Sequence, residues 1–290
     1  MKIGICTFEQ YHGKKEIGSS RIRGHWIAKA WGEDCEIYKT GRKYDVLIFQ
    51  KVYWSEMAKS FKGIKILDMC DADWLEWGPK IFETAQYCDY ITTSSLELAK
   101  FMVKNQDTPV AFIADRIDFD ELPSPKKHSG ELKKIAWYGY SSNFEVLYGA
   151  LPAIKKRGLE LTVISNNVFR LPTGMTDIEI TNLPFNPKTI YDDLQRSDAV
   201  LNPKLKTGRF KYKSNNKDTL PWALGLPSIE NEKEFDDIID GDKRQEVSDR
   251  LYRTAKEEYD ISLSVRDLKD IIKDIDEQRT TRKTNTENDT

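Results

Sequence analysis

The residues with the clearest capacity for chemistry lie in one basic segment near position 210. Residues 203–217 contain six cations and no anion, although the whole chain balances 45 Lys and Arg against 47 Asp and Glu. Such a segment is either an exposed basic loop or a local site for an anion. The residues that we expect to bind the anion are Arg209, Lys213, Ser214, Asn215, Asn216 and Lys217.

A helix predicted to begin at the end of this basic segment favours phosphate as the anion. Pro221 lacks an N–H group and is best tolerated in a first helical turn, so we expect a helix to begin near Lys217 or Asp218. The free N–H groups and the positive dipole end of a helix favour phosphate. The segment also follows a predicted strand at 199–202, and parallel α/β sheets bind ligands beyond the carboxyl ends of their strands.

Candidate bases follow two predicted strands of the N-terminal half. Glu9 and His12 come after the strand at 2–8, and Asp71 and Asp73 come after the strand at 65–70. A general base there could take a proton from a hydroxyl group. We select Asp71 and His12 as catalytic candidates, with a helix-capping role as the structural alternative for Asp71.

A second group of polar residues opens the helix predicted at 20–31. Arg21 and Arg23 are cations at a helix N-terminus, where they oppose the dipole unless an anion compensates them. That anion is a phosphate, an acidic acceptor or a neighbouring carboxylate. With Ser20 and Asp73, these arginines form our candidate set for acceptor or phosphate binding.

Aromatic residues accompany these candidates. Tyr53, Trp54, Trp74 and Trp77 lie in predicted loops of the N-terminal half. They either stack on a sugar ring or a base, or pack in the core.

The elements that position these residues alternate between strands and helices, which predicts an α/β fold with two doubly wound, Rossmann-like domains. In the helix at 20–31, Ile22, Trp26 and Ala30 share one predicted apolar face. The expected organisation is an N-terminal domain at 1–125, a second domain at 126–245, helices at 246–278 and a disordered tail without apolar residues at 279–290.

Composition narrows the function classes. A net charge of −2 excludes a general nucleic-acid coat, and no apolar run approaches the roughly 18 residues of a membrane span. The start of the chain predicts a strand and no signal peptide, so we expect a cytoplasmic protein without membrane insertion. The four cysteines are far apart and predict buried thiols, and no His or Cys spacing predicts a metal site.

The segments 213–217 and 223–229, KSNNK and ALGLPSI, resemble the donor-site signature of GT-B glycosyltransferases of the family 1 and family 4-like group. IAWYG at 135–139, SDAVLNP at 197–203 and GSSRIRG at 18–24 resemble further segments of that family, in the same order. The resemblance implies two Rossmann-like domains facing a cleft, with last helices that pack back on the first domain. It also implies a nucleotide-sugar donor whose diphosphate lies on the helix start, with Gly139 of the glycine turn among the donor-binding residues.

One departure from the family pattern bears on the stereochemistry. The glutamate pair of many retaining members is replaced here by Tyr212 and Leu220, so the resemblance does not imply retention. The implied reaction is a hexosyl or pentosyl transfer in which cations and helix N–H groups stabilise the departing diphosphate without a metal. We expect no cofactor and a UDP-sugar as co-substrate.

Several alternatives stay open. The acceptor could be a small molecule, a polysaccharide precursor, a protein or hydroxymethylpyrimidine in phage DNA, the last in the host cytoplasm. A sugar-nucleotide 2-epimerase shares the architecture but needs acid and base carboxylates around the sugar. A non-catalytic nucleotide-sugar-binding protein would keep the basic site at 213–217 but would release no nucleoside diphosphate with any acceptor.

Overall fold

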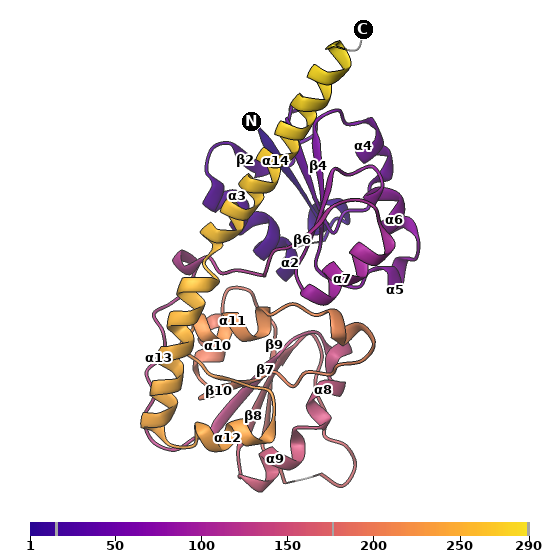
Figure 1. The fold of residues 1–290 in the computed structure, drawn as a ribbon. Coiled ribbons are helices and arrows are strands. Elements are labelled where there is room, and N and C mark those ends of the chain that lie inside the picture. Colours follow the sequence, from indigo (N-terminus) through magenta and orange to yellow (C-terminus); the bar gives the residue numbers. More distant parts are fainter. Residues whose placement is uncertain (15–16, 176, 289–290) are drawn as a thin grey trace. The chain divides into compact units, whose positions relative to one another are not determined.

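The computed structural model describes residues 1–14, 17–175 and 177–288 and divides the chain into two compact units. The first unit comprises residues 1–118, 211–215 and 259–290, and the second comprises 119–210 and 216–258. Each unit contains one parallel sheet (Figure 1). The expected α/β fold with two Rossmann-like domains is confirmed.

The first sheet has six parallel strands in the order β2-β1-β3-β4-β5-β6. Its central strands are buried along their whole length, as is usual for parallel strands covered on both faces. Their side chains form a continuous apolar core with those of the flanking helices. The strands are β1 (Ile3–Thr7), β2 (Cys35–Ile37), β3 (Val46–Gln50), β4 (Ile64–Met69), β5 (Tyr90–Thr93) and β6 (Val110–Phe112).

Short helices connect these strands, and one long helix returns from the end of the chain. The helix α14 (Ile261–Asn288) packs against α3 and β4 of the first unit (Figure 1). The other helices are α1 (Phe8–Tyr11), α2 (Gly18–Ser20), the π-helix η1 (Arg21–His25), α3 (Trp26–Trp31), α4 (Ser55–Ser60), α5 (Trp74–Trp77), α6 (Lys80–Ala85) and α7 (Leu96–Asn105).

The second sheet has five parallel strands in the order β11-β10-β7-β8-β9, which is the Rossmann order 3-2-1-4-5. Its strands are β7 (Lys134–Tyr138), β8 (Glu160–Ser165), β9 (Ile180–Pro184), β10 (Ala199–Leu201) and β11 (Ser228–Ile229). Around it lie the 3₁₀ turns η2 (Phe119–Glu121), η3 (Ser141–Asn143) and η4 (Gly208–Tyr212), and the helices α8 (Glu145–Tyr148), α9 (Leu151–Lys156), α10 (Ile190–Gln195), α11 (Asn216–Ala223), α12 (Glu232–Asp237) and α13 (Gly241–Glu258).

The observed boundaries differ from the expected ones at the C-terminal end. The helix α13 belongs to the second unit and α14 to the first. The segment expected as a disordered tail contains the end of α14, which runs to Asn288, and Arg279 forms an ion pair of 2.7 Å with Asp89. Residues 289–290 lie outside the described part of the chain.

The helix predicted at 20–31 contains an irregular turn. In η1 the N–H of Trp26 bonds to the carbonyl of Arg21, which adds one residue to the turn and shifts the register. Ile22 and Trp26 are buried as predicted, but Ala30 is exposed.

The described residues contain no helix long and apolar enough to cross a membrane.

Candidate functional site

Each sheet has one point at which its strand order reverses. In the second unit this point lies between β7 and β10, because β8 continues the sheet on the other side of β7. Gly139 follows β7 and Asn202 follows β10. Open α/β sheets bind ligands in the crevice beyond such a point, so these two strand ends are where the ligand of the second unit is expected.

Gly139 and Lys217 come together there. Gly139 has φ of +153°, and a Cβ atom at this position would lie 2.6 Å from Lys217 Nζ. The ammonium group of Lys217 lies 4.3 Å from the ring centroid of buried Trp137. Glycine at this position therefore allows the lysine ammonium group to lie against the carboxyl end of β7.

The first turn of α11 forms the other side of this strand end. Asn216 is the first residue of the helix, and the hydroxyl group of Tyr138 donates to its carbonyl at 3.4 Å. The Asn216 side-chain nitrogen is buried and has no hydrogen-bond partner among the described residues. A donor without an acceptor at a helix N-terminus suits an anionic ligand.

Pro221 does not begin this helix. It lies inside α11, which starts at Asn216, one residue before the predicted range. The proline leaves one intrahelical hydrogen bond unmade, since its nitrogen carries no hydrogen for the carbonyl of Lys217. The predicted placement of Asn216 and Lys217 in the first turn nevertheless matches the structure.

The one carboxylate in this first turn is neutralised. Asp218 accepts a hydrogen bond of 2.7 Å from the Asn202 amide and forms an ion pair of 2.8 Å with Lys204. Because these contacts occupy both carboxylate oxygens, Asp218 opposes a bound diphosphate less than a free aspartate would.

Arg209 is tied to the same strand end. Its guanidinium group donates to the carbonyl of Ser142, in the η3 turn that follows β7. The second unit thus brings Gly139, Arg209, Asn216 and Lys217 to the carboxyl side of its sheet.

The other predicted donor residues belong to the first unit. Lys213 forms an ion pair of 2.7 Å with Asp71. The side-chain oxygen of Asn215 accepts a hydrogen bond from the backbone N–H of Asp115 at 3.2 Å. Ser214 forms a hydrogen bond with the carboxylate of the same aspartate. The segment 213–217 is therefore divided between the two units, because side-chain contacts hold residues 211–215 on the first.

The strand order of the first unit reverses between β1 and β3. His12 follows β1, Lys51 follows β3, and Asp71 and Asp73 follow the neighbouring strand β4. The predicted catalytic residues thus lie near the point at which a doubly wound sheet takes its ligand.

A lysine joins the two aspartates. The ammonium group of Lys51 contacts Asp71 Oδ2 at 2.8 Å and Asp73 Oδ1 at 3.2 Å, and the hydroxyl of Tyr53 donates to Asp73 Oδ2 at 2.6 Å. Burial disfavours the charge on Asp71, but Lys51 and Lys213 outweigh it and lower the pKa of this carboxyl group. Burial raises the pKa of Asp73 to about 6. The two neighbouring carboxylates therefore differ in their affinity for a proton.

His12 is exposed within a group of aromatic rings. Its ring lies 4.4 Å from that of Phe8 and 5.3 Å from that of Trp77, measured between centroids. Desolvation and the positive charges of Lys14 and Lys51 lower the pKa of His12 below its ordinary value. The imidazole is therefore neutral at pH 7 and able to accept a proton.

The structure corrects the role predicted for Arg23 and Ser20. The Arg23 side chain is 3% exposed and forms ion pairs with Asp68 at 2.6 Å and Asp115 at 2.9 Å. Ser20 is fully buried and donates to the Gln50 side chain at 3.1 Å. Arg23 thus links η1 to β4 and to the segment that follows β6, and Ser20 links α2 to the end of β3.

Arg21 has a different environment. Its guanidinium group lies 5.4 Å from the ring centroid of Trp26, one turn along the same irregular helix. The role of Arg21 in phosphate binding stays a prediction, since a ring contact does not test it.

Comparison with solved structures identifies the fold. Anabaena HepE in complex with UDP and glucose is 10% identical, with a TM-score of 0.71 over 94% of this chain and 100% of that chain. T4 phage BGT in complex with its UDP-glucose substrate is 13% identical, with a TM-score of 0.57 over 94% and 99%. A glycosyltransferase from Rickettsia africae is 10% identical, with a TM-score of 0.58 over 94% and 97%. No protein-family model and no curated protein matches the sequence.

The chain has the fold of GT-B glycosyltransferases.

On this GT-B fold, the predicted aromatic residues divide into two groups. Trp74 stacks on Phe101 with 3.8 Å between ring centroids, which is a packing contact. Trp77 stacks on Phe8 with 5.7 Å between ring centroids and also lies beside His12. Trp54 lies 5.8 Å from the ring centroid of exposed Tyr11, the residue before His12.

Sequence reasoning missed Lys51. It follows a strand that was predicted, but a single lysine before an apolar residue carries no motif. Its unusual backbone conformation, with φ of 53°, is visible only in the structure.

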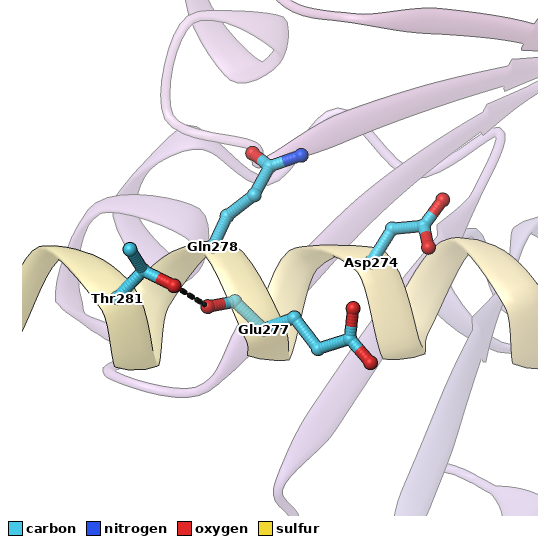
Figure 2. A pocket seen from close by; sticks show the side chains of 4 residues that line it. All are labelled: Asp274, Glu277, Gln278 and Thr281. Carbon is cyan, nitrogen blue, oxygen red and sulfur yellow. Dashed lines mark hydrogen bonds between the residues drawn. The ribbon is translucent and has the colours of Figure 1, made fainter.

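A separate hollow lies on the exposed face of α14. Figure 2 shows its lining residues, Asp274, Glu277, Gln278 and Thr281, all on this helix. Two carboxylates line it, so it does not suit a diphosphate. Within the described residues, no three His, Cys, Asp or Glu side chains gather as a metal site would require.

Proposed function

We propose that this chain transfers a sugar from a nucleotide sugar, a UDP-sugar, to a hydroxyl group of an acceptor. The observation that carries the proposal is the approach of Lys217 to Gly139 at the switch point of the second sheet. Two neighbours of the same fold support the choice of donor, since they were solved with UDP or UDP-glucose.

In the proposed reaction, the acceptor oxygen forms a bond to the anomeric carbon of the sugar. The bond from that carbon to the diphosphate oxygen breaks, and the nucleoside diphosphate leaves with the electron pair. The acceptor proton goes to a base. Lys217, Arg209 and the first N–H groups of α11 would stabilise the charge on the leaving diphosphate, so the proposal needs neither a metal nor another cofactor.

His12 fits the role of the base better than Asp71. Both Asp71 oxygens form ion pairs, with Lys51 and Lys213, and the lowered pKa of this carboxyl group makes it a weak base. His12 is exposed and neutral at pH 7. We therefore assign the proton to His12 and give Asp71 the task of holding the two lysines.

The rings around His12 support an acceptor that presents a ring of its own. Tyr11 is 47% exposed and lies 5.0 Å from His12 between centroids, and Lys14 lies over the Phe8 ring at 5.4 Å. Stacking serves a sugar ring or a nucleobase equally. Hydroxymethylated pyrimidine in DNA therefore belongs among the acceptors to be tested, with salt-sensitive binding as its signature.

The test is incubation with UDP-sugars in the presence and absence of acceptor panels, followed by mass spectrometry. A transferase releases UDP and adds the mass of one sugar residue to an acceptor. An epimerase converts its sugar nucleotide without any acceptor, and a binding protein leaves it unchanged. Either of the last two outcomes would contradict the proposal.

The base is tested with His12→Gln. We expect kcat/KM to fall about 10²- to 10⁴-fold. In the unmodified protein, kcat/KM should rise with pH through a value below 6.5 and then level off, because the imidazole must be neutral to accept the proton. Unchanged kinetics in the variant would remove His12 from the reaction.

A further inference from the structure

Lys51 has a backbone conformation that lysine rarely adopts. Among the described residues it is the one non-glycine residue with positive φ, at 53°. Its N–H donates to the carbonyl of Asp68 at 2.9 Å, which fixes this turn at the end of β3 against β4. Such strained residues persist where the surrounding structure holds them, and they are often found at functional sites.

The turn brings the Lys51 ammonium group between two carboxylates. The side chain is 12% exposed and contacts Asp71 at 2.8 Å and Asp73 at 3.2 Å. The same ammonium lies 5.0 Å from the ring centroid of Phe8, the residue whose ring also contacts His12. One cation therefore touches the residues that follow β4 and the aromatic group that follows β1.

The ammonium group of Lys51 faces several titratable groups of the first unit. Lys51 faces Asp71, Asp73 and the buried thiol of Cys70, whose pKa burial raises well above its ordinary value. His12 faces the positive charges of Lys14 and Lys51. Without Lys51, two neighbouring carboxylates would repel each other, and His12 would meet less positive charge.

We propose that Lys51 is a positioning residue of the transfer site: it fixes Asp71 and Asp73 at the sheet edge and places a positive charge beside the aromatic group that contains His12. This inference rests on the proposed function, in which His12 accepts the proton of the acceptor. Lys51 contacts neither the sugar nor the leaving diphosphate in this account and acts through the three other side chains. The strained backbone conformation of Lys51 directs its side chain toward the residues that follow β4.

The test uses a variant that removes the charge without adding strain. Glycine favours positive φ, so Lys51→Gly deletes the ammonium group and relieves the backbone. Lys51→Arg keeps the charge, and Lys59→Met removes a charge from an exposed position on α4 as a matched control. The chain has three histidines, and the spectrum of His12→Gln identifies the His12 signal in an NMR titration.

We expect the titration midpoint of His12 to rise in Lys51→Gly, since a nearby positive charge is lost. It should stay at the unmodified value in Lys51→Arg and Lys59→Met. The rising limb of the kcat/KM profile should move by the same amount. An unchanged midpoint in Lys51→Gly would overturn the inference.

The titration separates this inference from the proposed function. It needs no substrate, so it reports on Lys51 even if no acceptor is glycosylated. A shifted midpoint with no sugar transfer by the unmodified protein would contradict the proposed function and leave the electrostatic role of Lys51 intact. A shifted midpoint together with an unmoved kcat/KM profile would exclude a positioning role in the reaction.

Discussion

Replacing Lys217 by alanine is the most informative single substitution. Its ammonium group is held at the carboxyl end of β7, 4.3 Å from the Trp137 ring centroid and within 2.6 Å of where a Gly139 Cβ would lie. A charge-assisted hydrogen bond to phosphate contributes about 1.5 to 3 kcal/mol, so Lys217→Ala should weaken UDP binding about 10- to 150-fold. Loss of the cation–π contact should lower the free energy of unfolding by about 0.5 to 2 kcal/mol.

Isothermal titration calorimetry with UDP measures the first effect, and urea denaturation measures the second. Lys206→Ala is the matched control, because Lys206 is an exposed cation of the same basic segment and its removal changes the net charge equally. We expect this control to bind UDP within about twofold of the unmodified protein, as is usual for an exposed charge. Equal UDP affinity in both variants would refute the assignment of Lys217 to the diphosphate.

Three further substitutions test other parts of the account. Gly139→Ala should weaken UDP binding and cost about 1 to 3 kcal/mol of stability, measured in urea, because φ of +153° and Lys217 oppose a Cβ atom. Arg23→Met should lower the free energy of unfolding by about 3 to 5 kcal/mol, since it leaves Asp68 and Asp115 buried without their cation, while calorimetry should find UDP affinity unchanged. Burial raises the pKa of Asp73 to about 6 from 3.8, so its contribution to stability is present below pH 3.8 and lost as pH rises through 6. Asp73→Asn should flatten that part of the curve of stability against pH; coincident curves would contradict the shift.

The fold could be predicted because its signals are local. Buried parallel strands such as β3 are short apolar runs, and alternation with helices predicts a doubly wound sheet. The exceptions carry no local signal in the sequence. The π-turn η1 interrupts the helix predicted at 20–31. The ion pair between Arg279 and Asp89 joins α14 to a residue 190 positions earlier, which no local pattern can show.

The site could be predicted in part for the same reason. Gly139 and Lys217 lie at a strand end and a helix start, positions that local sequence features mark. The carboxylates that capture Arg23 and Lys213 come from distant strand ends, so sequence alone left these cations available to an anion. Lys51 was missed because its role depends on a backbone conformation and on partners about 20 residues away.

The central claim is that the diphosphate of a nucleotide sugar binds between the end of β7 and the start of α11. A crystal structure of the protein with bound UDP tests it most directly. We predict phosphate oxygens within hydrogen-bond distance of Lys217 Nζ and of the Asn216 side-chain nitrogen, with Gly139 directly beneath them. A diphosphate bound elsewhere, with Lys217 still over Trp137 and Asn216 without a ligand, would contradict the claim.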